Sequence, residues 1–219
     1  MDRTFPTASA GTCWMVLLRH GATPMNRVSP PRLQGRQTDL ALTDEGLAQA
    51  RAAAEFLAPV RVDRVYSSPL LRARQTAEAV AAPHGIAVEP VELLIEADVG
   101  EWEGMTWEEA ERHAPEAYRA FVRDAGENPY LGGESLGQVR RRVVSAFERL
   151  LAENEGRVIA VVAHNVVNRC YLAELLGVPL ANYRAVAQSN CGVNLIRHRN
   201  GQTRVVTLNA VFHLADDGL

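Results

Sequence analysis

Two histidines and two arginines stand at positions where an α/β protein could bind an anion. His20 directly follows the first apolar run of the chain, and His164 directly follows a later one. Such runs predict buried parallel strands, and ligands of open α/β sheets bind outside the carboxyl ends of the strands. Arg19 precedes His20, and Arg72 belongs to a helical segment whose side chains lean toward its amino end. Imidazole is a competent nucleophile near neutral pH and guanidinium binds phosphate, so the four residues together indicate phosphoryl chemistry.

The elements that must position these residues alternate between strand and helix. Repeated β-α units with short links predict a three-layer α/β/α fold with a mostly parallel central sheet and helices on both faces. Apolar runs predict strands at 14–18, 62–66, 86–91 and 157–163, and a terminal hairpin of 191–197 and 203–208. Apolar residues at helical spacing predict helices at 43–58, from a cap at Ser68 to about 82, at 135–150 and at 165–176.

Three local interpretations follow from the same pattern. With Ser68 as the amino-terminal cap of its helix, Arg72 lies about one turn inside that helix. The arginine run 140–142 falls on the polar side of an amphipathic helix and is interpreted as a solvated face. The irregular stretch 92–133 is expected to pass over one edge of the sheet, with helical periodicity in 106–122.

Composition narrows the class of protein. The chain has 219 residues, with 23 lysines and arginines against 26 acidic residues, so its formal net charge is −3. No overall basic field exists to hold a nucleic acid, and no apolar run near the start is long enough to span a membrane. Three scattered cysteines without a CxxC pair argue against a disulfide framework and a cysteine zinc site. We therefore expect a cytoplasmic protein with a loose leader at 1–12 and a single domain at 13–219.

Several ordered blocks of the sequence resemble one family. Residues 18–26, LRHGATPMN, resemble the LRHGxTxxN signature of the histidine phosphatase superfamily, which includes the cofactor-dependent phosphoglycerate mutases. Ordered blocks at plausible spacing are a specific signal, and here they extend from residue 15 to about 208. Further similar blocks are QG at 34–35, DLALTDEG at 39–46, SSPLLRARQTA at 67–77, EADVGEWEG at 96–104, GESL at 133–136 and VVAH at 161–164.

The resemblance implies a phosphoglycerate mutase-like fold and a reaction that needs no metal and no cofactor. It implies that His20 is the nucleophile that forms a phosphohistidine, and that Glu96 protonates the leaving oxygen. Arg19, Arg72 and His164 would balance the charge of the phosphoryl oxygens, which is the task of Mg²⁺ in other phosphoryl-transfer enzymes. Glu96 must then hold a proton at working pH, so we expect its pKa to be raised. The resemblance also assigns phosphate or substrate contacts to Thr23, Asn26, Gln34 and Gly35.

The sequence departs from the family pattern at two positions. Asn165 stands where the family usually has glycine, and Ala41 replaces the usual proline. A side chain at position 165 could reshape one wall of the pocket, so Asn165 is a further candidate for substrate contact. Glu101 and Glu103 are alternatives to Glu96 as the acid, and only the family spacing favours Glu96.

The expected function is hydrolysis of a small phosphorylated metabolite. One alternative is a phosphoglycerate mutase, which shares the pocket but passes the phosphoryl group to a second acceptor. Another is a regulatory module that binds phosphate without turnover, since fold and motif do not guarantee activity. The GESL block and the short chain favour hydrolysis, and the complete set of candidate catalytic residues argues against the module. We also expect a homodimer, and no nucleic acid or membrane partner.

Two other chemistries find no support in the sequence. Cys13 and Cys191 each precede an arginine at the C-x5-R spacing of cysteine-dependent phosphatases. That chemistry needs a loop that cradles phosphate, whereas both intervening segments are predicted strands. The remaining histidines show no HxH or HExxH spacing, so no metal site is expected from His84, His113, His198 and His213.

Overall fold

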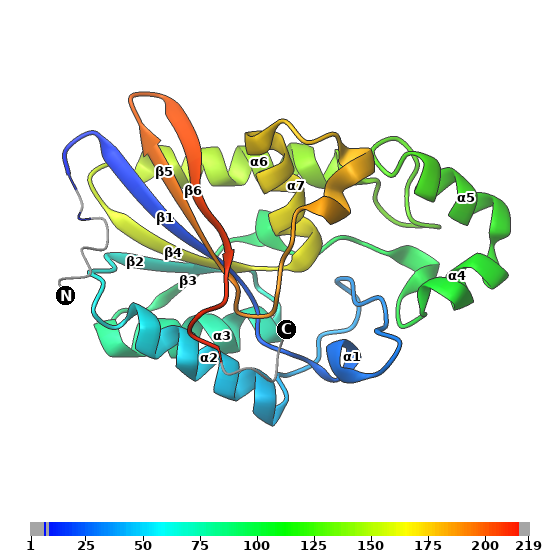
Figure 1. Ribbon diagram of the computed structural model, residues 1–219, viewed down its shortest axis with the longest axis horizontal. Coiled ribbons are helices and arrows are strands. Elements are labelled where there is room, and N and C mark those ends of the chain that lie inside the picture. Colours follow the sequence, from blue (N-terminus) through cyan, green and yellow to red (C-terminus); the bar gives the residue numbers. More distant parts are fainter. Residues whose placement is uncertain (1–6, 8, 215–219) are drawn as a thin grey trace.

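The computed structural model describes residue 7 and residues 9–214 of the chain. Residues 1–6 and 8 of the expected leader, and residues 215–219 of the expected domain, lie outside the described residues. One six-stranded sheet forms the centre of the fold (Figure 1). Its strands are β1 (Thr12–Arg19), β2 (Arg64–Ser67), β3 (Val88–Pro90), β4 (Val158–Ala163), β5 (Val193–Arg199) and β6 (Gln202–Ala210).

The sheet is mostly parallel, as predicted. Its strand order is β3-β2-β4-β1-β5-β6. The neighbouring strands among β3, β2, β4 and β1 run parallel, whereas β5 and β6 are joined to one side as an antiparallel hairpin. Every residue of β4 is buried, which is typical of a parallel strand that is covered on both faces.

Helices cover both faces of the sheet. Successive residues of a strand point to opposite faces. Met15 and Leu17 of β1 belong to the core under α6 (Leu136–Glu153) and α7 (Asn165–Leu176), and Val16 and Leu18 belong to a second core under α2 (Asp44–Leu57) and α3 (Leu71–Ala81). The predicted three-layer α/β/α fold is thereby confirmed (Figure 1). The helices are α1 (Pro24–Arg27), α2 (Asp44–Leu57), α3 (Leu71–Ala81), α4 (Trp107–His113), α5 (Pro115–Arg123), α6 (Leu136–Glu153) and α7 (Asn165–Leu176), and in the described residues none is long and apolar enough to cross a membrane.

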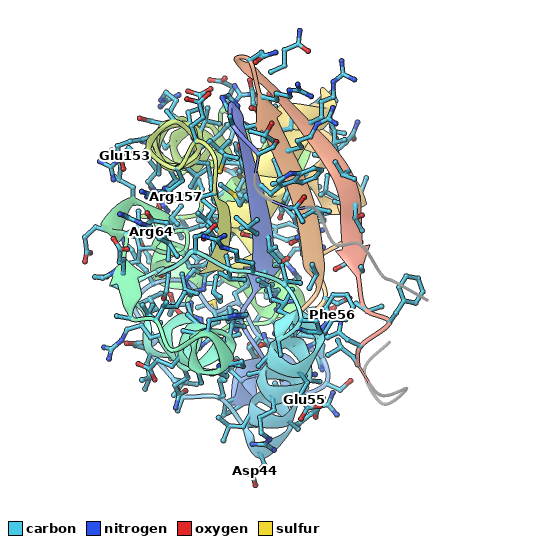
Figure 2. The ribbon with its side chains drawn as sticks, turned by 90° about the vertical axis from the view of Figure 1, so that its left-hand side faces the viewer. Asp44, Glu55, Phe56, Arg64, Glu153 and Arg157 are labelled. Atoms are coloured by element: carbon cyan, nitrogen blue, oxygen red, sulfur yellow. The ribbon has the colours of Figure 1, made fainter. Side chains whose placement is uncertain are left out.

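The carboxyl ends of the parallel strands meet at one edge of the sheet. The register places the ends of β1, β4 and β2 side by side. The residues that follow these strands are His20, His164 and Ser68. Figure 2 faces the opposite edge, where Arg64 begins β2 and Arg157 precedes β4. The predicted anion site and this second edge are therefore at opposite ends of the strands.

Helix α3 begins later than the sequence predicted. Its first residue is Leu71 and its cap position is Leu70, so the cap assigned to Ser68 is wrong and Arg72 lies in the first turn. The physical reason is that Leu70 still has an extended backbone conformation, while the Ser68 hydroxyl bonds to the ring of His164.

The irregular stretch after β3 forms an extension of the fold. It contains α4 and α5, which Pro115 separates by starting a new helix. Both helices lie beyond the carboxyl ends of the parallel strands, on the right of Figure 1. The strand before this stretch, β3, is shorter than the predicted strand 86–91.

Candidate active site

The two histidines at the carboxyl edge of the sheet lie next to each other. The ring centroids of His20 and His164 are 5.2 Å apart, and the residues are 3% and 0% exposed. Nδ1 of His20 lies 2.7 Å from the carbonyl oxygen of Gly21. A carbonyl oxygen can only accept, so Nδ1 carries the hydrogen and Nε2 of the neutral ring keeps a free lone pair. The ring of His20 is thus oriented as a nucleophile would be.

His164 is held through Nε2, whereas His20 is held through Nδ1. Its Nε2 lies 2.7 Å from Ser68 Oγ, and its Nδ1 is buried with no hydrogen-bond partner in the described chain. The backbone N–H of Leu70 donates to Ser68 Oγ at 3.3 Å. A hydroxyl that accepts from Leu70 can donate its own hydrogen to Nε2, which leaves the hydrogen of the neutral ring on Nδ1. In this tautomer His164 presents an unused donor.

Arg19 and Arg72 supply two more unused donors. Arg19 Nη1 donates to the carbonyl oxygen of Gln188 at 2.8 Å. Arg72 donates to the carbonyl oxygens of Gly35 at 2.8 Å and Thr38 at 3.1 Å. In both side chains Nε is buried and has no partner among the described residues. Backbone carbonyl groups therefore orient both guanidinium groups and leave a donor free on each.

Burial and neighbouring charge keep both histidines neutral. Burial, followed by the charges of Arg72 and Arg19, lowers the pKa of His20 well below its ordinary value of 6.5. Burial and the charge of Arg72 also lower the pKa of His164. Burial lowers the pKa of Arg19 to about 10, which leaves it protonated near neutral pH. The site thus combines two neutral imidazoles with two cations.

Glu96 contributes a buried carboxyl group. It is 3% exposed and lines a cavity of about 380 Å³ together with Arg19 and His20. Its oxygens accept three backbone N–H groups at 2.9 to 3.3 Å, two of them from the first turn of α7. These bonds and the charge of Arg72 favour the carboxylate, but burial outweighs them and raises the pKa of Glu96. The direction of this shift agrees with the prediction, and burial is its cause.

The two alternative acids lie outside this cavity. Glu101 is at the surface, with an oxygen 3.1 Å from Nε2 of His113. Glu103 accepts the backbone N–H of Gly35 at 2.8 Å. Neither of the two is among the residues that line the cavity, whereas Glu96 lines it together with His20.

Arg142 holds the segment that carries Glu96. Its guanidinium donates to the carbonyl oxygen of Glu96 at 3.2 Å and to two preceding carbonyl oxygens at 2.7 Å each. It also pairs with Glu134, at 3.0 Å through both Nε and Nη2. The prediction that residues 140–142 form a solvated face is wrong for Arg142, because its side chain is only 16% exposed. The reason is that the segment 93–96 lies against this side of α6, where its carbonyl oxygens accept from Arg142.

An Arg142→Met variant is expected to be less stable than the wild type. The substitution leaves three carbonyl oxygens of the segment 93–96 without this donor and the half-buried Glu134 without its counter-ion, so we expect the free energy of unfolding to fall by about 3 kcal/mol. Urea denaturation followed by circular dichroism measures this change. Arg141→Met is the matched control, because Arg141 is exposed and its loss is expected to cost at most about 0.5 kcal/mol. Equal stability of the two variants would contradict the role of Arg142 in holding this segment.

The four polar residues assigned to substrate contact divide into two groups. Thr23 is 0% exposed and donates through Oγ1 to Gln34 Oε1 at 2.7 Å and through its N–H to Asn26 Oδ1 at 3.1 Å. Asn26 and Gln34 line the cavity, whereas Thr23 and Gly35 do not. A Cβ atom at Gly35 would lie 2.6 Å from the carbonyl oxygen of Ala97, so glycine permits this close approach. Substrate contact by all four residues stays a prediction, and Thr23 also holds Gln34 and Asn26 in place through its hydrogen bonds.

Two asparagines complete the wall of the cavity. Asn165, the departure from the family pattern, lines it, and its Oδ1 is buried without a hydrogen-bond partner among the described residues. Asn190 also lines it and donates to the carbonyl oxygen of His20 at 2.9 Å. The sequence analysis missed Asn190, because it lies in the loop before β5, outside every motif and strand end that we used.

Comparison with known proteins shows which family has this arrangement. The sequence profile of branch 1 of the histidine phosphatase superfamily matches residues 15–211. The chain belongs to the histidine phosphatase superfamily. The resemblance seen in residues 18–26 and in the later blocks of the sequence is thereby confirmed. The matched range contains both histidines, both arginines and Glu96 of this histidine phosphatase.

The relatives of this histidine phosphatase are themselves named as phosphatases. The chain is 32% identical over 202 residues to phosphoserine phosphatase 1 of Hydrogenobacter thermophilus, and the match covers 92% of this chain and 94% of the relative. It is 38% identical over 176 residues to the glucosyl-3-phosphoglycerate phosphatase of Mycolicibacterium vanbaalenii, with 77% and 76% of the two chains covered. A solved phosphoserine phosphatase of Entamoeba histolytica in complex with phosphoserine has a TM-score of 0.83 at 28% identity, and the match covers 93% and 100% of the two chains. The family and these relatives show that the chain is a phosphatase of the phosphoglycerate mutase-like α/β fold.

Proposed function

We propose that this histidine phosphatase hydrolyses a small phosphorylated metabolite through a phosphohistidine on His20. The observation that carries the proposal is the set of unused donors beside the His20 ring. Arg19 Nε, Arg72 Nε and His164 Nδ1 are buried without partners in the described chain, although buried polar groups are nearly always hydrogen-bonded. A phosphoryl group in contact with Nε2 of His20 supplies the acceptors that these donors lack.

In the first half-reaction, the lone pair of His20 Nε2 forms a bond to phosphorus. The P–O bond to the leaving group breaks, and the proton of the Glu96 carboxyl group moves to the leaving oxygen. Arg19, Arg72 and His164 donate hydrogen bonds to the phosphoryl oxygens and balance their charge. Because these side chains supply what a metal ion supplies in other phosphoryl-transfer enzymes, we propose that the reaction needs neither a metal nor a cofactor.

In the second half-reaction, water attacks the phosphorus of the phosphohistidine. Glu96, now a carboxylate, accepts a proton from this water, and the P–N bond breaks. His20 recovers its lone pair and Glu96 its proton, so the cycle consumes only the ester and one water. The carbonyl oxygen of Gly21 accepts the hydrogen of Nδ1, and this bond stabilises the positive charge of the phosphorylated ring.

The proposed substrate is a small molecule. The cavity of about 380 Å³ is within the range of sites that bind metabolites. Two of the relatives are named for phosphoserine and glucosyl-3-phosphoglycerate, which are both small phosphomonoesters. The net charge of −3 supports a metabolite over a nucleic acid. The three cysteines are buried and form no disulfide, which supports a reducing, cytoplasmic setting. The expected homodimer stays a prediction.

The proposal is tested by phosphate release from a panel of phosphomonoesters in the presence of EDTA. The panel contains p-nitrophenyl phosphate, phosphoserine and 3-phosphoglycerate, and quenched samples are examined for protein-bound phosphate that is labile in acid and stable in base. We expect release that survives EDTA, together with such a phosphoenzyme. Phosphoryl transfer from 2,3-bisphosphoglycerate to a phosphoglycerate in place of hydrolysis would favour a mutase. No release from any ester would favour a module that only binds phosphate.

A further inference from the structure

Two arginines on the wall of the cavity have no acidic partner. Arg169 lies in the second turn of α7, and Arg184 lies in the 3₁₀ segment η4 (Leu180–Ala185). Both line the cavity that contains His20. Among the described residues neither forms an ion pair, although Glu108 lines the same cavity. Their charge is therefore available to a ligand.

Two other arginines of this region, Arg32 and Arg36, are already neutralised by carboxylates. Arg32 also lines it, but its Nη1 lies 3.0 Å from Glu109 Oε2. Arg36 lies 2.6 Å from a carboxylate oxygen of Asp98. The unpaired state of Arg169 and Arg184 is thus a property of those two positions and not of every arginine in this region.

The guanidinium groups of Arg169 and Arg184 are held in place by their neighbours. The Cζ atom of each lies 5.8 Å from the ring centroid of Tyr183, and Cζ of Arg184 lies 4.4 Å from the ring centroid of Trp107. Nε of Arg169 donates to the carbonyl oxygen of Val186 at 2.9 Å, and Nε of Arg184 donates to the Tyr183 hydroxyl at 3.4 Å. Within the described chain the terminal nitrogens of both groups have no hydrogen-bond partner. The two groups are therefore oriented in advance while their forked donors remain free.

The two arginines continue the line of positive charge that starts at the reaction centre. Burial is the main cause of the lowered pKa of Arg19, and the charge of Arg169 contributes to it. Burial also lowers the pKa of Arg169, the charge of Arg184 lowers it further, and the charge of Glu96 opposes both. Arg169 therefore lies within electrostatic reach of the phosphoryl-binding groups and of Arg184, which is exposed. Like charges held close together are stabilised by an anion that binds to both.

We propose that Arg169 and Arg184 form a second anion subsite, which binds a carboxylate on the leaving group of the substrate. The proposal rests on the hydrolysis proposed above and adds that the substrate is a phosphorylated carboxylic acid. With the phosphoryl group at Arg19, a carboxylate a few bonds from the ester oxygen meets the next two arginines along the wall. The planar fork of a guanidinium group matches the two oxygens of a carboxylate, which is why an acid is preferred over an alcohol.

Matched pairs of substrates test the subsite. Phosphoserine is compared with phosphoethanolamine, which lacks the carboxylate, and 3-phosphoglycerate is compared with glycerol 3-phosphate, which has a hydroxymethyl group in its place. For the wild type we expect kcat/KM to be about 10- to 100-fold higher for the acid of each pair. Arg184→Gln and Arg169→Gln are each expected to reduce this ratio strongly, mainly through KM of the acid. Arg184→Lys, which keeps the charge but loses the fork, is expected to recover part of it.

Arg32→Gln is the matched control at the same cavity. Because Glu109 already neutralises Arg32, we expect this variant to keep the preference for the acid within about twofold. A wild type that does not distinguish the members of a pair, or a preference that survives both glutamine substitutions, would overturn the subsite. A preference for fructose 1,6-bisphosphate over both acids would overturn its assignment to a carboxylate. Failure of the proposed hydrolysis itself is distinguishable, because the wild type would then leave p-nitrophenyl phosphate intact as well.

Discussion

Replacement of His20 by alanine is expected to remove turnover of every phosphomonoester. Without the Nε2 lone pair no phosphohistidine forms, and the remaining donors can bind phosphate but cannot open the covalent route. Loss of a nucleophile of this kind costs about 10⁴-fold or more in kcat. The measurements are phosphate release from p-nitrophenyl phosphate and phosphoserine, and the amount of acid-labile phosphate on the quenched protein. Both are expected to fall to the background level in His20→Ala.

A second histidine variant controls for general damage to the fold. His84 lies in the 3₁₀ segment η1 (Ala82–His84), which contributes no residue to the lining of the cavity. His84→Ala is therefore expected to retain turnover and to form the phosphoenzyme. Full turnover by His20→Ala would show that another group attacks the phosphorus. Equal loss in both variants would show that the assay reports folding and not the nucleophile.

Replacement of Glu96 by glutamine is expected to affect the two half-reactions differently. An alkyl ester such as phosphoserine needs a proton on its leaving oxygen, so kcat is expected to fall by about 10²- to 10⁴-fold. p-Nitrophenolate leaves without a proton, so its first release is expected to persist as a burst. Attack by water then lacks its base, and labelled phosphohistidine is expected to accumulate. Rapid-quench measurement of the burst and of the bound label tests both expectations, and equal loss on the two substrates without bound label would contradict the role of Glu96.

The pH profile gives a separate test of Glu96. His20 must be neutral to attack, and its lowered pKa places the acid limb of kcat/KM below the ordinary histidine value of 6.5. Glu96 must be protonated to donate, so activity is expected to fall as the pH rises through its pKa, which burial raises above the ordinary 4.5. The alkaline limb is expected to disappear in Glu96→Gln, whereas the acid limb remains. An alkaline limb that is unchanged in this variant would assign it to another group.

The sequence by itself was sufficient to predict which edge of the sheet carries the site. Buried strands are runs of apolar residues, and the residue after such a run must lie at the carboxyl end of a strand. This local relation was sufficient to bring His20, Arg19 and His164 together, and the structure places them at neighbouring strand ends. The parallel core and the helices on both faces followed from the same pattern, because hydrophobic periodicity is a property of each segment by itself.

The tertiary structure decided how the side chains are held and charged. The sequence predicts Ser68 as a helix cap, yet its hydroxyl orients His164, a residue 96 positions away. The sequence predicts that Arg142 is solvated, yet its guanidinium group holds the segment that carries Glu96. The raised pKa of Glu96 depends on burial outweighing three backbone donors and the charge of Arg72, a balance that only the assembled site contains. Local sequence determines which residues can be helix, strand or strand end, whereas hydrogen bonds and electric fields between distant segments exist only once the chain has folded.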